Sequence, residues 1–300
     1  MTIPFIGPEA EAKLDWLALT RALEAGHDLP RAEIGDTLLY RDPDTLLSRA
    51  AWIDGLGALV KTATIFPGNA DLGKPAIGGA VSLFSDQDGT LAAMLDFTLV
   101  TKWKTAGDSL LAATRLARPD STRILIVGSG TVAASLHQAY SAAFPNASFT
   151  VWSRTESSAR RFAETHGIDH APDLTGAVPE ADIVTCATMT TEPILQGDRL
   201  RPGQHIDLIG AYRPDMREAD DAALQRATIF VDARATTLDH IGELKLPLAS
   251  GMITKADIAA DYYDGPAMRR TSDDEITLFK NGGGAHLDLM TARYILDVVG

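Results

Sequence analysis

The sequence contains one cysteine, Cys186, and nowhere runs through about 18 consecutive apolar residues. One cysteine cannot form an internal disulfide or a thiolate metal site, so we expect a reducing, cytoplasmic setting. Residues 1–14 include acidic side chains where a secretory signal requires a basic start followed by an apolar run. We therefore expect a protein that is neither exported by this route nor inserted in a membrane.

Acidic residues outnumber basic residues in this sequence. The 27 lysines and arginines face 40 aspartates and glutamates, which gives a formal charge of −13 and a pI near 4.9. A polyphosphate backbone or an anionic bilayer is bound by a concentrated basic face, so we expect no nucleic-acid partner. The seven histidines lack metal-ligand spacing, and His137 and His286 are interpreted as packing or surface residues, so no metal is predicted.

The remaining composition is that of an ordinary globular protein, with 45% hydrophobic and 22% charged residues. At about 150 residues per domain, 300 residues favour two domains. The pattern changes near Arg118-Pro119-Asp120, and before that point it is mixed. It predicts helices over residues 9–25 and 99–117, strands over 37–40, 57–66, 80–84 and 90–95, and a hairpin turn at 86–89.

After this boundary, short apolar runs alternate with helical patterns, which predicts a parallel sheet with helices on both faces. The last apolar helix, residues 286–299, must pack somewhere, and we expect it to return to the N-terminal domain. The predicted fold is therefore α/β, with a doubly wound domain over 119–277 inserted in a discontinuous α+β domain over 1–118 and 278–300. The expected strands after the boundary are residues 123–127, 148–152, 183–186, 206–209 and 228–231, with a further apolar segment at 276–280.

A glycine loop gives the sharpest local signal. The buried-strand run Ile124–Val127 is followed by Gly128-Ser129-Gly130-Thr131-Val132-Ala133 and then by a helical pattern. In this G-x-G-x-x-A arrangement Gly128 permits a tight turn, Gly130 admits a pyrophosphate, and Ala133 keeps the helix close to the sheet. The loop predicts a Rossmann-type dinucleotide site that includes Ser129, Thr131 and Val132. A glycine turn without a ligand is the alternative.

The second strand of the inserted domain ends in Ser153-Arg154-Thr155. NAD enzymes usually place a carboxylate there to hold the ribose hydroxyl, whereas a guanidinium between two hydroxyls suits a ribose phosphate. The sequence therefore favours NADPH as the cofactor, with NADH also possible. A solvated surface role for Arg154 is the alternative.

Two later strands end where the nicotinamide is expected in this architecture. They are followed by Cys186-Ala187-Thr188 and Gly210-Ala211-Tyr212, whose small residues leave room for the ring. Cys186 is included in this set, although for its own side chain the pattern favours a small buried hydrophobic residue over a cofactor contact.

A series of motifs runs in order along nearly the whole chain: Val60-Lys61, Phe66-Pro67-Gly68-Asn69, Thr105-Ala106, Arg118-Pro119, the glycine loop, residues 210–218, Gly242-Glu243-Leu244 and residues 278–288. Together these motifs resemble the ornithine cyclodeaminase/mu-crystallin family. It implies a homodimer in which the discontinuous domain makes both the dimer contact and the pocket for a small-molecule substrate. Members include ornithine cyclodeaminases, alanine dehydrogenases, ketimine reductases and reductases of cyclic imino acids.

The resemblance also implies a basic cluster that binds the substrate carboxylate. By position it includes Lys61, Arg31 and Lys104, although arginine is usual at the last position and lysine cannot replace its bidentate geometry. Lys61 lies in an apolar strand pattern, where an unpaired ammonium is costly, so a function is favoured. Arg31 can equally be a surface residue. Asp288 matches an acidic family position and is expected to orient the substrate nitrogen or a water, with capping or dimer contact as the alternative.

In the cyclodeaminases of this family a catalytic aspartate follows the strand equivalent to residues 206–209, and this sequence has Tyr212 there. We therefore hypothesise NAD(P)H-dependent reduction of Δ1-pyrroline-2-carboxylate or its six-membered homologue Δ1-piperideine-2-carboxylate, to L-proline or L-pipecolate. Lys61 and Asp288 are the predicted catalytic residues. The rivals are an ornithine cyclodeaminase or alanine dehydrogenase of the same family, and a non-catalytic, crystallin-like protein that binds NADPH.

Overall fold

The computed structural model describes residues 3–300 and divides the chain into two compact units. The first comprises the residues up to Lys104 together with Gly284–Gly300, and the second comprises Thr105–Gly283. The boundaries therefore differ from those predicted at 118/119 and 277/278. The first falls within a helix, α2 (Phe97–Leu116), and the second lies later because residues 277–280 form a strand of the second unit's sheet.

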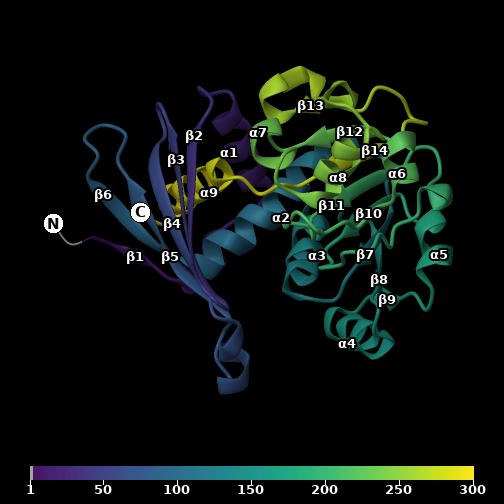
Figure 1. The fold of residues 1–300 in the computed structure, drawn as a ribbon, viewed down its shortest axis with the longest axis horizontal. Helices are drawn as coiled ribbons and strands as arrows, with labels where there is room; N and C mark the ends of the chain where they lie inside the picture. Colours follow the sequence, from purple (N-terminus) through teal and green to yellow (C-terminus); the bar gives the residue numbers. More distant parts are fainter. Residues whose placement is uncertain (1–2) are drawn as a thin grey trace. The chain divides into compact units, whose positions relative to one another are not determined.

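Within the described part of the chain, the first unit is built on a six-stranded sheet of order β1-β6-β5-β4-β3-β2. Neighbouring strands are antiparallel except β1 and β6, which are parallel. Figure 1 shows helix α9 beside this sheet, where it contacts β3, β4, β5 and helix α1. The elements are β1 (Phe5–Ile6), α1 (Trp16–His27), β2 (Glu33–Arg41), β3 (Asp44–Ile53), β4 (Gly57–Ile65), β5 (Ile77–Phe84), β6 (Leu91–Asp96) and α9 (Ala285–Val299), with short 3-10 helices at Pro8–Lys13 and Pro67–Leu72.

The helix predicted over residues 9–25 is wrong in one respect, because the structure divides it. A 3-10 helix covers Pro8–Lys13, and α1 begins at Trp16. The carboxylate of Asp15 accepts a hydrogen bond from the backbone N–H of Ala18 at 2.7 Å, which caps α1 and fixes its start. The amphipathic pattern did not resolve this interruption.

Residues 105–283 contain an eight-stranded sheet in which every neighbouring pair is parallel. Its order, β13-β12-β14-β11-β10-β7-β8-β9, confirms the α/β fold class and the Rossmann-type parallel sheet. The strands are β7 (Arg123–Val127), β8 (Ser148–Trp152), β9 (Asp169–His170), β10 (Ile183–Cys186), β11 (His205–Leu208), β12 (Thr228–Val231), β13 (Ile258–Asp261) and β14 (Thr277–Lys280). The helices are α3 (Thr131–Ala143), α4 (Glu156–His166), α5 (Leu174–Ala177), α6 (Asp221–Arg226), α7 (Arg234–Thr237) and α8 (Gly242–Ser250).

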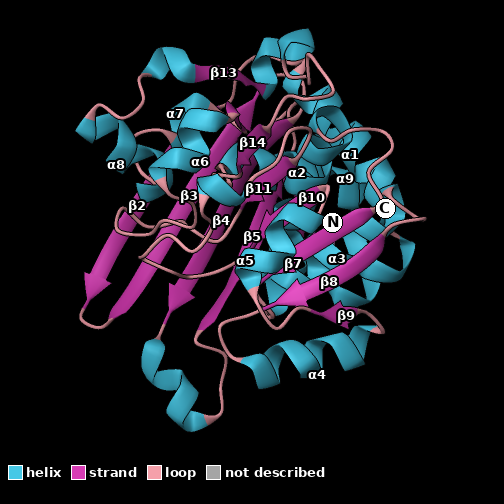
Figure 2. Ribbon diagram, turned by 90° about the vertical axis from the view of Figure 1, so that its right-hand side faces the viewer, coloured by secondary structure: helices cyan, strands magenta, loops and turns pink. Residues whose placement is uncertain are grey.

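The order of these strands creates a switch point between β7 and β10. From β7 the chain proceeds through β8 to β9 on one side, whereas β10 and β11 follow on the other. In open α/β sheets, ligands bind outside the carboxyl ends of the strands at such a point. Figure 2 shows α4 along the β8–β9 edge. No helix within residues 3–300 combines the length and apolar character needed to cross a bilayer.

Candidate active site

A buried ion pair lies between the sheet and the last helix of the first unit. Lys61 is in the middle of β4, on the face that also buries Leu59 and Ala63, and Asp288 is in the first turn of α9. The Lys61 ammonium donates a hydrogen bond to Oδ1 of Asp288 at 2.8 Å, and it lies 4.8 Å from the centre of the Phe97 ring. Asp288 is completely buried, and a helix N-terminus favours its negative charge. The structure thus joins the two predicted catalytic residues.

Two further cations face this pair. Sheet register places Arg49 of β3 directly opposite Lys61, with Asp36 of β2 opposite Arg49. A guanidinium nitrogen of Arg49 lies 4.0 Å from Oδ2 of Asp288, and another donates to Asp36 at 2.7 Å. Lys104 is a buried residue of α2 and the last residue of the first unit before the second begins. Its charge lowers the pKa values of both Lys61 and Asp288. These five residues comprise three cations and two carboxylates, so the cations outnumber the carboxylates among them by one.

Burial and this charge balance shift the pKa values of the pair. Burial lowers the pKa of Lys61 below its ordinary value, with Asp288 opposing the shift and Lys104 adding to it. Burial alone raises the pKa of Asp288, but Lys61, Lys104 and Arg49 together bring it below its ordinary value. At neutral pH Asp288 is therefore a carboxylate. Lys61 is a stronger acid than a lysine in water.

The other two predicted residues of this cluster, Lys104 and Arg31, differ in burial. Arg31 is exposed just before β2, and the cations that shift the pKa values of Lys61 and Asp288 are Lys104 and Arg49 instead. Its part in substrate binding stays a prediction. Sequence reasoning missed Arg49 because it did not predict β3. The missed signal is the one used for Lys61, a cation on the inward face of a strand, two residues before the buried Ala51.

His286 is completely buried in the first turn of α9, its ring 5.3 Å from that of His27. Burial and the charge of Lys104 lower its pKa to about 3, so the ring is neutral at physiological pH. Its burial fits the packing interpretation and excludes the surface one. Within residues 3–300, no group of three or more histidine, cysteine, aspartate and glutamate side chains is arranged to hold a metal ion.

In the second unit, the glycine loop has the geometry that dinucleotide binding requires. Gly128 follows β7 with φ +118°, a conformation that favours glycine, and a Cβ there would lie 2.7 Å from the carbonyl oxygen of Ala187. A Cβ at Gly130 would meet no heavy atom within 4 Å, so the backbone faces open space. Gly130 also caps α3 without a side-chain hydrogen bond, which leaves first-turn N–H groups for an anion. This loop fits a pyrophosphate.

The other side chains of the loop and the segment after β8 are accessible. Thr131 and Val132 are exposed, and Ser129 is half-buried. Arg154 is exposed, which leaves its guanidinium accessible to a ribose phosphate. Between β8 and α4, the hydroxyl of Ser153 donates to the carbonyl of Thr155 at 2.9 Å.

The turn after β10 packs against the glycine loop on one side and against the turn after β11 on the other. Ala187 and Thr188 are half-buried, Gly210 packs directly against Thr188, and Tyr212 is 60% exposed. Cys186 requires a correction, because its side chain is completely buried in the hydrophobic core beneath this edge. Burial raises the pKa of its thiol well above the ordinary value. Cys186 is therefore a packing residue and not a cofactor contact.

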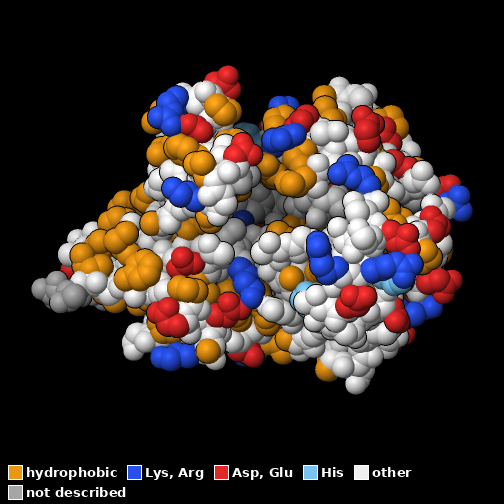
Figure 3. Space-filling model, turned by 90° about the horizontal axis from the view of Figure 1, so that it is seen from below, with side chains coloured by type: hydrophobic (Ala, Val, Ile, Leu, Met, Phe, Trp, Pro, Cys, Tyr) orange, Lys and Arg blue, Asp and Glu red, His pale blue; other side chains and the backbone are white. Residues whose placement is uncertain are grey.

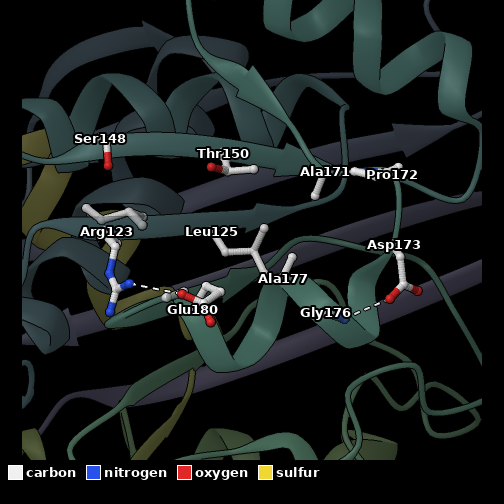
Figure 4. A pocket seen from close by; sticks show the side chains of 12 residues that line it. Arg123, Leu125, Ser148, Thr150, Ala171, Pro172, Asp173, Gly176, Ala177 and Glu180 are labelled. Carbon is white, nitrogen blue, oxygen red and sulfur yellow. Dashed lines mark hydrogen bonds and ion pairs between the residues drawn. The ribbon is translucent and has the colours of Figure 1, made fainter.

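A separate cavity of about 380 Å³ lies in the second unit, away from the glycine loop. Its lining includes Arg123 and Ser148, which begin β7 and β8, whereas Gly128 follows the opposite end of β7. Figure 4 shows the ion pair between Arg123 and Glu180, 3.1 Å long, at one side of this cavity. The cavity is thus distinct from the dinucleotide loop.

The chain is similar to known proteins over nearly its whole length. The profile of the ornithine cyclodeaminase/mu-crystallin family matches residues 54–299. A Δ1-pyrroline-2-carboxylate reductase of Paracoccus denitrificans is 52% identical, over 97% of this chain and 95% of the relative. The structure of the Thermococcus litoralis Δ1-pyrroline-2-carboxylate reductase with NADH and L-proline has a TM-score of 0.89 at 23% identity, covering 99% and 97% of the two chains. An archaeal alanine dehydrogenase dimer with bound NAD also reaches 0.89, at 26% identity and 99% and 96% coverage.

Proposed function

The chain belongs to the ornithine cyclodeaminase/mu-crystallin family, and on this premise we propose that it reduces Δ1-pyrroline-2-carboxylate with a nicotinamide cofactor. The near full-length similarity to the Paracoccus reductase carries the proposal. The product is L-proline, and Δ1-piperideine-2-carboxylate, which gives L-pipecolate, is the second expected substrate. The enzyme is thus an NAD(P)H-dependent oxidoreductase that acts on C=N bonds.

The first unit supplies the charges that this substrate requires. The carboxylate of the imino acid is the anion that the excess positive charge of Lys61, Arg49 and Lys104 favours. Arg49 supplies a planar guanidinium, which Lys104 cannot imitate, although the pairing of Arg49 with Asp36 moderates its charge. Holding the carboxylate fixes the ring, so that the imine carbon is presented in one orientation.

The proton needed by the imine nitrogen is assigned to Lys61. A protonated cyclic imine is an iminium ion, and a bound dihydronicotinamide supplies the hydride that its carbon accepts. Lys61 is the hydrogen-bond donor of the pair and burial makes it a stronger acid, whereas Asp288 is a carboxylate and has no proton to give. Within residues 3–300, Oδ2 of Asp288 accepts no hydrogen bond, so it is available to stabilise the positive nitrogen. Lys61 donates the proton and Asp288 favours the iminium.

The second unit holds the cofactor. Gly128, Gly130 and the start of α3 bind the pyrophosphate, and Arg154 with its two hydroxyl neighbours binds a ribose phosphate. NADPH is the favoured cofactor, and NADH is the alternative cofactor.

One spectrophotometric assay tests this function. Purified protein is mixed with NADPH and Δ1-pyrroline-2-carboxylate, and the loss of NADPH is followed beside parallel reactions with NADH and with pyruvate plus ammonia. Rapid oxidation with the imine alone is expected. Turnover only with pyruvate and ammonia would identify an alanine dehydrogenase. If no reaction oxidises the cofactor, a cyclodeaminase or a protein that only binds NADPH is favoured. Ammonia release from ornithine then identifies the cyclodeaminase.

We further propose a homodimer formed through the first sheet and working in the cytoplasm, the compartment that suits the single buried Cys186. All nine residues of the edge strand β2 are exposed, including the apolar Leu38, Leu39 and Tyr40. Such an edge offers both unpaired backbone groups and apolar surface to a second copy. In Figure 3, hydrophobic side chains also gather on the first unit toward the N-terminal end. Sedimentation equilibrium should give twice the chain mass of 32.0 kDa, and Leu39→Asp should shift the protein toward monomer. A monomeric wild type would contradict this.

A further inference from the structure

Three backbone turns meet at the carboxyl ends of β7, β10 and β11, which are adjacent in the sheet. A Cβ at Gly128 would lie 2.7 Å from the carbonyl oxygen of Ala187, and one at Gly210 would lie 1.9 Å from that of Thr188. Both glycines are therefore required by close approach. The turn after β10 is packed between the other two, at the switch point where ligands bind in such sheets.

One buried carboxylate ties two of these turns together. Oε1 of Glu218 accepts hydrogen bonds from the backbone N–H and the hydroxyl of Thr188, at 2.7 and 2.9 Å. Oε2 accepts from the N–H groups of Gly210 and Ala211, at 2.6 and 3.4 Å. Glu218 is completely buried, so it does not touch a bound molecule itself. Its four donors hold the turn after β10 against the turn after β11.

The position of Glu218 is fixed in turn. Its own N–H and that of Ala219 donate to the two carboxylate oxygens of Glu243, at 2.7 and 3.0 Å. Burial raises the pKa of Glu218 to about 8 and also raises that of Glu243, while Lys280, buried at the end of β14, opposes both shifts. The backbone N–H groups of Thr188, Gly210 and Ala211 can only donate to Glu218, and the Thr188 hydroxyl is the one group facing it that can also accept. These donors favour the carboxylate against the effect of burial.

We propose that Glu218 is a positioning residue for the nicotinamide end of the cofactor. It holds Thr188 and Gly210 beside the expected position of the nicotinamide ring. The adenosine end of the site, beside Arg154, does not depend on it. The inference rests on the proposed function in that it takes the second unit to bind a nicotinamide cofactor. A merely structural role for Glu218 would weaken the whole domain and both ends of the site equally.

The test compares two ligands that share the adenosine end. NADPH carries the nicotinamide, and 2′-phospho-ADP-ribose does not; NADH and ADP-ribose replace them if NADH binds more tightly. Glu218→Gln keeps the shape but turns one acceptor into a donor that faces an N–H group. We expect the Kd for NADPH to rise about tenfold or more, while the Kd for the ribose ligand changes less than about twofold. In turnover, KM for NADPH should rise and kcat should fall.

Asp207→Asn is the matched control. Asp207 lies in β11 and, like Glu218, has a completely buried carboxyl group. It accepts hydrogen bonds from the hydroxyls of Ser109, Tyr140 and Thr185 and does not contact the turns. This variant should lose stability and keep the wild-type ratio of the two Kd values. The proposal is overturned if Glu218→Gln weakens both ligands in parallel, or if Asp207→Asn changes the ratio as much.

A milder pair of variants applies if Glu218→Gln does not fold. Thr188→Val removes one hydroxyl donor to Glu218, and Thr188→Ser keeps it. The valine variant should weaken NADPH selectively, and the serine variant should restore wild-type binding; equal effects would overturn the proposal. A wild type that binds NADPH but reduces no imine would refute the proposed function alone, because the Kd ratio still tests Glu218. A wild type that binds neither ligand refutes both.

Discussion

The buried pair of Lys61 and Asp288 makes the sharpest prediction about stability. Removing one member of a buried pair leaves an uncompensated charge, which typically costs about 3–5 kcal/mol. Lys61→Met keeps an apolar stem beside Phe97 and strands the carboxylate of Asp288, which is completely buried. Because Arg49 and Lys104 still face that carboxylate, we expect the free energy of unfolding to fall by about 3 kcal/mol.

The double variant Lys61→Met/Asp288→Leu removes both charges and should recover most of this loss, since an apolar pair of similar volume often replaces a buried ion pair at little cost. Activity should not recover. Both variants should lose nearly all imine reduction while their Kd for NADPH stays within about twofold of wild type. The Kd should hold because the cofactor residues lie in the second unit.

Equilibrium unfolding in urea at pH 7 measures these free energies. The pKa of Asp288 is lowered on folding, so its contribution is fully present above about pH 4 and is lost as the pH falls through the folded value. Lys102→Met is the control, because it removes a partly exposed lysine paired with Glu11 and should cost no more than about 1 kcal/mol. The reasoning is refuted if Lys61→Met costs no more than this control, or if the double variant is as unstable as the single one.

Three further outcomes are expected. Gly130→Ala should leave the melting temperature unchanged, because its Cβ enters only open space, and should weaken NADPH binding at least tenfold by titration, because that space is where the pyrophosphate is expected. Gly128→Ala should weaken binding and also lower the melting temperature, because its Cβ meets the Ala187 carbonyl. Arg154→Ala should raise the Kd for NADPH about tenfold and leave that for NADH within about twofold; equal effects on both would remove Arg154 from phosphate recognition. Burial lowers the pKa of His205 to about 3, so below pH 6.5 the unfolded chain binds a proton that the folded one does not. Relative to His205→Gln, the wild type should lose about 1 kcal/mol of stability between pH 6.5 and 5.5 in urea titrations, and a constant difference would contradict the shifted pKa.

The second unit could be predicted well because its signals are local. A buried strand, a glycine turn and a helix start are adjacent in sequence at Ile124–Ala133, and the structure places a strand, a turn and a helix there. The place of residues 277–280 could not be predicted in this way. Their pairing with β11 and β12 joins segments far apart in the chain, and an apolar run alone does not say which sheet receives it.

The first unit was harder for the same reason. Lys61 was found because its charge interrupts an apolar strand, but the pairing with Asp288 joins residues separated by 227 positions. Arg49 was missed with its strand β3, whose alternation is weak because residues on both faces are only partly buried. Glu218 gave no sequence signal of its function. Its importance comes from four donors that only the folded turns bring together.

The division of the first unit between two chain segments has a consequence for synthesis on the ribosome. Strands β3, β4 and β5 emerge early, but α9, which packs against them and carries Asp288, is translated only after the whole of Thr105–Gly283. At about 5–20 residues per second, this interval lasts roughly ten to forty seconds. During that time the second unit is complete and can fold, whereas the first sheet presents an uncovered apolar face. We expect nascent chains to need protection by chaperones in this interval, and Lys61 to gain its partner only near the end of translation.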